Sequence, residues 1–116
     1  MSEDLIKNYT EREESIRYAL NILNGKWKLK ILWEISRCGT VRFNKLQKNL
    51  DGISSIMLSR SLNELSEYNL VNRKQYSEIP PRVEYTLTDL GKSLCPVLHA
   101  IEDWGYKVKS KCEKEA

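Results

Sequence analysis

The chain has 116 residues, of which 41% are hydrophobic, so it can bury one core and is too short for a second domain. Its formal net charge of +3 is mild, and the composition alone does not require a polyanionic partner. The N-terminus lacks the order of a secretory signal, and no apolar run approaches the roughly 20 residues of a membrane span. We therefore expect a cytoplasmic protein without a membrane partner.

Reactive side chains are few and scattered. Cys38, Cys95 and Cys112 lie far apart, no CxxC motif is present, and His99 is the only histidine. This pattern excludes a zinc finger and provides no disulfide framework. The sequence also lacks a catalytic triad, a metal-ligand set and a phosphate-binding loop, so we expect neither an enzyme nor a bound cofactor.

The first regular helix is expected to begin at Ser15, a suitable N-cap, and to end at the Asn24-Gly25 turn. Ile16 and Leu20 lie on its apolar side. Residues 1–14 are mostly polar, and two interpretations remain open for them: a frayed arm, or a short helix that docks on a partner subunit.

Residues 26–37, KWKLKILWEISR, have a periodicity that fits either a strand or a helix. We favour a helix because the run is long for a strand and because Lys, Leu and Glu favour helices. In that helix Trp33 points away from Trp27, so Trp33 should be buried against another helix or another subunit. Cys38-Gly39 ends the helix, and a short extended piece leads to Asn44 as the next cap.

Residues 44–67 have the pattern of a helix-turn-helix. The run 44–50 predicts a short helix, Asp51-Gly52 predicts a turn, and Ser54 is suited to cap a second helix. That second helix has an inward face made of Leu58, Leu62 and Leu65. Its outward face carries hydrogen-bonding side chains and no carboxylate in the first two turns: Ser55, Ser59, Arg60 and Asn63. Such a face suits the DNA major groove.

Two strands follow, at 71–76 and 83–87, and the second alternates between an apolar and a polar face. A β-hairpin directly after a helix-turn-helix forms a wing, and its prolines stiffen the loop. Lys74 at its base and Arg82 at its tip would reach a phosphate backbone, although an ordinary solvated hairpin is an equal alternative. From Arg42 to Arg82 there are seven basic residues against four acidic ones.

The C-terminal segment 88–111 predicts one long helix capped by Thr88 and bent near Lys92 by Pro96. Its apolar residues recur at alternating spacings of three and four, as in a coiled-coil seam. The alternatives are an intrachain core and a homodimer, and we favour the homodimer because a short domain has little else to cover the last turns. The expected dimerisation residues are Ile16, Leu20, Trp33, Leu94, Val97, Leu98, Ile101, Trp104 and Val108.

Three runs, NGKWKLKILWEI, VRFNKLQKNLDGISSIMLSRSLNELSEYNLV and YSEIPPRVEYTLTDLGKSLCPVL, resemble the HxlR family of bacterial winged-helix transcription regulators, which is related in architecture to the MarR type. The resemblance covers roughly residues 15–105. It implies a mainly α fold with a small β-hairpin wing: a winged helix-turn-helix domain at 15–111, with its helix-turn-helix at 44–67, its wing at 71–87 and a dimerisation helix at 88–111.

The resemblance also implies a homodimer that binds a pseudo-palindromic operator in double-stranded DNA, with recognition helices in successive major grooves and wings along the flanking minor groove or backbone. The residues placed at the DNA in this way are Ser54, Ser55, Ile56, Ser59, Arg60, Asn63, Lys74, Pro80, Pro81 and Arg82. Arg42 and Lys45 are basic residues that we expect to bind phosphates beside them. A winged helix that binds other proteins instead of DNA is the alternative.

The sequence departs from the family pattern at a position that many members use to sense oxidants. Family members that respond to oxidants often carry a cysteine just before the first helix, where this chain has Glu14 followed by Ser15. That thiol mechanism therefore does not transfer. Aromatic side chains of Trp33, Trp104 and Tyr106 admit two interpretations: plain packing at the dimer contact, or a pocket for a small aromatic effector.

Overall fold

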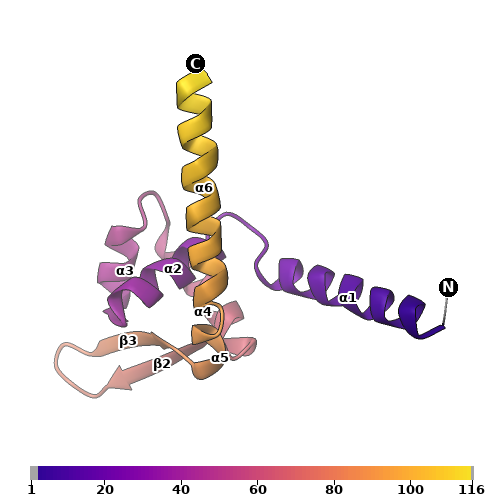
Figure 1. Cartoon of the computed structure of the whole chain (residues 1–116). Helices are drawn as coiled ribbons and strands as arrows, with labels where there is room; N and C mark the ends of the chain where they lie inside the picture. Colours follow the sequence, from indigo (N-terminus) through magenta and orange to yellow (C-terminus); the bar gives the residue numbers. More distant parts are fainter. Residues whose placement is uncertain (1–2, 116) are drawn as a thin grey trace.

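The computed structural model describes the backbone of residues 3–115 and the side chains of residues 10–114. Its elements are α1 (Glu3–Ile22), α2 (Lys28–Cys38), β1 (Thr40–Arg42), α3 (Phe43–Asn49), α4 (Ser55–Glu67), β2 (Val71–Tyr76), β3 (Arg82–Leu87), α5 (Asp89–Lys92) and α6 (Cys95–Glu115). A central body holds α2 to α5 and the sheet, while α1 and the outer part of α6 project from it in different directions (Figure 1). The predicted mainly helical class with a β-hairpin is confirmed.

The sheet has three antiparallel strands in the order β1-β3-β2. The hairpin of β2 and β3 was predicted. The pairing of β1 was not: residues expected only to be extended bind β3, with Val41 opposite Tyr85. Because alternate side chains face opposite sides of a sheet, Val83, Tyr85 and Leu87 share the inner face, and Tyr85 and Leu87 are buried in the core.

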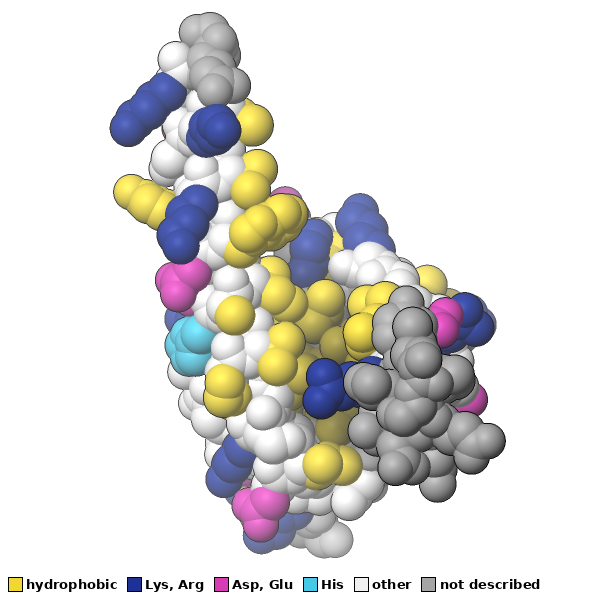
Figure 2. All heavy atoms as spheres, turned by 45° about the vertical axis from the view of Figure 1, so that its right-hand side comes forward, with side chains coloured by type: hydrophobic (Ala, Val, Ile, Leu, Met, Phe, Trp, Pro, Cys, Tyr) yellow, Lys and Arg dark blue, Asp and Glu magenta, His cyan; other side chains and the backbone are white. Residues whose placement is uncertain are grey.

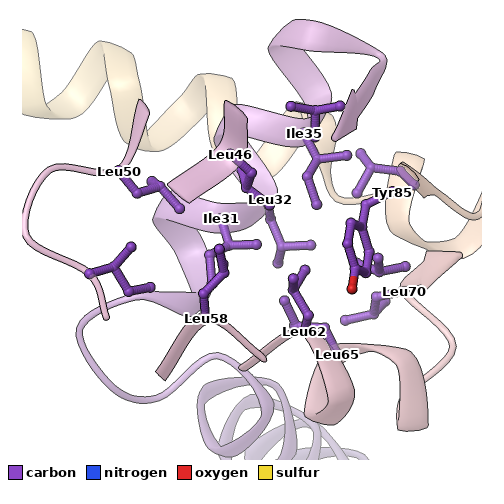
Figure 3. Close-up of a cluster of buried hydrophobic side chains, with 14 of the residues drawn as sticks. Ile31, Leu32, Ile35, Leu46, Leu50, Leu58, Leu62, Leu65, Leu70 and Tyr85 are labelled. Carbon is purple, nitrogen blue, oxygen red and sulfur yellow. The ribbon is translucent and has the colours of Figure 1, made fainter. Parts of the chain in front are cut away.

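The hydrophobic core holds α4 in place through the buried face of that helix. Ile31, Leu32 and Ile35 of α2 meet Leu58, Leu62 and Leu65 of α4, with Leu46 of α3 beside them (Figure 3). All seven are fully buried. Burying such a side chain contributes roughly 1.5 to 3 kcal/mol, so the orientation of α4 is strongly determined. The helical interpretation of residues 26–37 is confirmed for Lys28–Cys38.

Three predicted end signals are confirmed. Ser54 Oγ accepts a hydrogen bond from Met57 N at 3.1 Å and caps α4. Asn69 has a φ of 59° and turns the chain after α4. Thr88 Oγ1 accepts from Gly91 N at 2.9 Å and donates to Asn69 O at 2.6 Å, which joins the cap of α5 to the end of α4.

Two predicted caps are wrong. Ser15 lies inside α1, where its hydroxyl donates to Glu11 O, so the expected boundary after residue 14 does not exist. The polar residues before it are good helix formers, and a serine inside a helix can satisfy its hydroxyl on the preceding turn. Residues 1–2 lie outside the described part. The N-cap of α3 is Arg42 instead of Asn44, because β1 runs directly into the helix.

The single C-terminal helix is also corrected. The segment breaks at Ser93-Leu94 into α5 and α6, and α6 extends to Glu115. Pro96 has no N–H to donate to the carbonyl of Lys92, and its ring would clash with that carbonyl in a continuous helix. A break, and not a bend, therefore separates the two helices.

Candidate nucleic-acid interface

The outward face of α4 is solvent-exposed along its length. Ser55, Ser59, Arg60 and Asn63 are all exposed, and Ile56 is 73% exposed between them. These side chains lie opposite the buried leucines, since residues three and four apart share a helix face. Hydrogen-bonding groups and one free apolar side chain thus stand together at the N-terminal half of the helix.

A hollow separates this face from the wing. Ser59 and Asn63 of α4 form one side, Arg42 to Asn44 form another, and Arg73 with the loop from Glu78 to Val83 completes it. The structure therefore brings together the recognition helix, the start of α3 and the wing, as the helix-turn-helix interpretation requires. Pro80 and Pro81 are exposed in the loop, and the Ile79–Pro80 peptide bond is cis.

Several cations at this surface have no counter-ion. Arg42, Lys45, Arg60 and Arg73 are exposed, and within the described part of the chain none has a carboxylate at ion-pair distance. Glu64 of α4, by contrast, is paired with Lys28 at 2.8 Å. Unpaired cations beside a face rich in hydrogen-bond donors are suited to bind a polyanion that also offers hydrogen-bonding groups.

Arg73 is a site residue that the sequence reasoning missed, although it was counted in the local excess of basic residues. The signal that could have found it is alternation along β2: Arg73 is two residues from buried Val71 and opposite Tyr85, so it shares the inner face of the sheet. Lys74 is on the outer face, in the middle of the hairpin opposite Glu84 and not at its base.

Arg82 is engaged within the wing. Its Nη2 lies 3.4 Å from Glu78 Oε1, its Nε lies 3.3 Å from Glu84 Oε1, and its guanidinium is centred 3.9 Å from the Tyr76 ring. The expected phosphate-binding residue at the tip thus already has two carboxylate neighbours.

Comparison with known proteins agrees with this geometry. The sequence model of the HxlR-like helix-turn-helix family matches residues 22–113. The chain belongs to this family. It is 43% identical over 91 residues to an HTH-type transcriptional regulator of Methanothermobacter thermautotrophicus, a match that covers 78% of this chain and 69% of that protein. It is 37% identical over 99 residues to the HTH-type transcriptional regulator YdeP of Bacillus subtilis, covering 85% and 77% of the two chains.

Solved structures give the same result. The redox regulator HypR in its reduced form is similar with a TM-score of 0.79 and 31% identity, over 86% of this chain and 98% of that one. The HxlR-like chain is thus a DNA-binding transcriptional regulator, and its relatives are regulators and not enzymes.

The expected dimerisation residues of this HxlR-like chain fall into two groups. One group is exposed: Ile16 and Leu20 on α1, and Val97, Ile101, Trp104 and Val108 on α6, which are 40% to 68% exposed. Figure 2 shows hydrophobic side chains in a row along α6 and in the hollow beside it. The other group is covered by its own chain: Leu94, Leu98 and Trp33.

Leu98 is 4% exposed and belongs to the core of its own chain, so it has almost no surface to offer a second copy. Leu98 lies about 100° around α6 from Val97 and lines the hollow between α2 and α6 together with Trp33. Trp33 is half-buried, with its ring edge-on to that of His99 at 5.7 Å. The second surface expected for Trp33 is therefore α6 of its own chain.

The aromatic pocket considered as an alternative would lie between the helices of two copies, and the single chain does not test it. Trp33 lines a hollow between α2 and α6 together with Trp27, Leu98 and Ile101. Trp104 and Tyr106 are exposed and take no part in its lining.

The cysteines are all free, and Cys38 and Cys112 are exposed. Within the described residues there is no cluster of three or more potential metal ligands. No helix of the described part is long and apolar enough to span a membrane.

Proposed function

We propose that this regulator binds DNA as a homodimer, with α4 of each copy in one of two successive major grooves of a pseudo-palindromic operator. The observation that carries the proposal is the outward face of α4, which is exposed, rich in hydrogen-bonding groups and bordered by unpaired cations. The inner face of the same helix is fully used by the core, so only the outward face is free to bind. Because its partner is DNA, we place the dimer in the cytoplasm.

The side chains of α4 would read base edges. Arg60 suits guanine, Asn63 suits adenine, and the exposed methyl groups of Ile56 suit the thymine methyl. The hydroxyl groups of Ser55 and Ser59 would hydrogen-bond to base edges without selecting one kind of base. Ser54 would act through the start of α4, whose backbone N–H groups favour a phosphate. The cations around the helix would set its register by binding phosphates: Arg42, Lys45, Arg73 and Lys74. Pro81 would hold the wing loop along the flanking DNA.

The dimer would form between α1 of one copy and α6 of the other. The apolar residues of both helices are exposed in the single chain, including Leu20 at 64% and Trp104 at 68%. The net charges are complementary: α1 carries five acidic and three basic residues, whereas residues 107–115 of α6 carry four lysines and two glutamates. Glu13 and Lys109 are already paired within their own helices, with Arg17 and Glu113. A two-fold axis would repeat this contact and would double the basic surface presented to DNA.

Fluorescence anisotropy with fragments selected from genomic DNA tests the proposal. With about eight phosphate contacts in the dimer, the logarithm of affinity should fall against the logarithm of salt with a slope near −7. Light scattering on the same sample should give twice the mass of the chain. A strictly monomeric protein, or one that ignores every duplex at low ionic strength, would contradict it.

A further inference from the structure

Arg82 differs from the other cations of the wing. Its side chain is 25% exposed and lies between Glu78 and Glu84, whereas Arg73 and Lys74 are exposed and lack carboxylate partners in the described part of the chain. Arg82 and Lys74 both lie over the ring of Tyr76, Arg82 at 3.9 Å and Lys74 at 4.9 Å. The Nε of Arg82 is buried, faces Glu84 and makes no hydrogen bond of good geometry. The guanidinium is thus held by the carboxylates and the ring of the wing itself, although Arg82 also lines the hollow beside α4.

The two carboxylates lie where DNA would approach. Glu78 is half exposed and lines the hollow that Ser59 and Asn63 also line. Glu84 is opposite Arg42 on one neighbouring strand and opposite Lys74 on the other, so it lies between these two cations on the outer face of the sheet. Without a counter-ion, both carboxylates would repel phosphates at that surface.

Leaving this arrangement would be unfavourable for Arg82. To bind a phosphate, the guanidinium would have to move off the Tyr76 ring and away from two carboxylates, which would then face the same phosphate. We propose that Arg82 is an internal counter-ion of the wing, a positioning residue that neutralises Glu78 and Glu84 so that Arg42, Arg73 and Lys74 can bind the DNA backbone. This inference rests on the proposed DNA-binding mode.

The role of Arg82 as a counter-ion can be tested in the full-length protein by making one substitution in two backgrounds. Operator affinity is measured by anisotropy for Arg82→Gln in the native background and in a background carrying Glu78→Gln and Glu84→Gln. In the native background Arg82→Gln should weaken binding roughly tenfold, because it exposes two like charges to the phosphates. In the second background the same substitution should cost less than about threefold, because no carboxylate remains to be neutralised.

Lys45→Gln is the matched control, since Lys45 is an exposed cation outside the wing with no ion-pair partner among the described residues. Its cost should be the same in both backgrounds. An equal cost of Arg82→Gln in both backgrounds would overturn the inference. Two explanations would then remain: Arg82 binds a phosphate directly, or it only keeps the hairpin folded. Thermal unfolding separates those two cases, because loss of the hairpin also lowers Tm in the triple variant. Failure of the unmodified protein to bind DNA would instead reject the proposed function.

Discussion

The side-chain amide of Asn49 donates a hydrogen bond to Oε1 of Glu34 across 3.0 Å. This bond joins α2 to the end of α3, immediately before the turn that leads to α4. Arg37 and the thiol of Cys38 donate to the same oxygen. The hydrogen bond and charge of Arg37, helped by Asn49, lower the pKa of Glu34 below its ordinary value, although burial acts to raise it.

Glu34→Gln should therefore make stability less dependent on pH. A lowered pKa in the folded state means that Glu34 adds stability above its unfolded pKa of about 4.3, and that this contribution is lost as the pH falls through the folded value. At pH 7 the substitution should cost roughly 1 kcal/mol by weakening a buried hydrogen-bond acceptor. Thermal unfolding between pH 7 and pH 3 should show the two proteins converging in acid.

The control for this prediction is Glu67→Gln, which removes an exposed carboxylate at the end of α4. Its effect should be within about 0.5 kcal/mol at neutral pH, as for other surface substitutions. A difference between Glu34→Gln and the unmodified protein that stays constant down to pH 3 would contradict the role given to Glu34.

Gly91 should not tolerate a side chain. A Cβ at this position would lie 2.1 Å from the carbonyl oxygen of Leu70 and 3.3 Å from Cβ of Leu87. The backbone of the chain that follows α4 would have to move, so Gly91→Ala should destabilise the protein by about 3 kcal/mol or more. Denaturant unfolding measures this loss.

Gly105→Ala is the matched control. Gly105 is also helical, and a Cβ there would meet no atom within 4 Å of the single chain. Alanine should stabilise α6 by roughly 0.5 to 1 kcal/mol, because glycine loses more backbone entropy on folding. If Gly91→Ala left stability unchanged or raised it, as expected for Gly105→Ala, the close approach to Leu70 would not constrain Gly91.

Local patterns predicted much of the fold. The leucine spacing of α4, the Ser54 and Thr88 caps and the alternation of β3 each depend on neighbours within a few residues, and all are confirmed. The outward face of α4 followed from the same spacing, because fixing the buried side of a helix also fixes its exposed side.

Part of what failed depended on partners far along the chain. The pairing of β1 with β3 joins segments more than forty residues apart, and nothing near Val41 signals it. The position of Arg73 was missed although alternation from apolar Val71 indicates the inner face; only its contact with the hollow beside α4 depends on distant residues. The engagement of Arg82, by contrast, is local: Glu84 is two residues along the same strand, so alternation places both side chains on one side, and this signal was overlooked. Ser15 failed for a different reason, because a cap residue also fits inside a helix.

Arg60→Ala should relax base preference at one position of each half-site and cost roughly 1 to 3 kcal/mol, because a bidentate contact to a base edge is lost. Lys74→Ala should instead weaken binding to all sequences alike and reduce the salt slope by about one for each wing. Affinities for a set of single-base operator variants distinguish the two patterns. If Arg60→Ala leaves discrimination among those variants intact, Arg60 does not read a base.

The dimer contact can be tested on two aromatic residues of one helix. Trp104 and Tyr106 are exposed to similar extents, 68% and 74%, but lie roughly 200° apart around α6. Trp104 stands on the side of Val97 and Val108, so Trp104→Glu would place a charge in the proposed contact. The dimer should weaken by 2 kcal/mol or more, roughly thirtyfold, while Tyr106→Glu should leave it unchanged. Analytical ultracentrifugation over a range of concentrations gives the dimer dissociation constant of each variant. DNA affinity should fall only for Trp104→Glu, because a monomer bound to one half-site binds weakly. Equal dissociation constants for the two variants would place the contact elsewhere on the molecule.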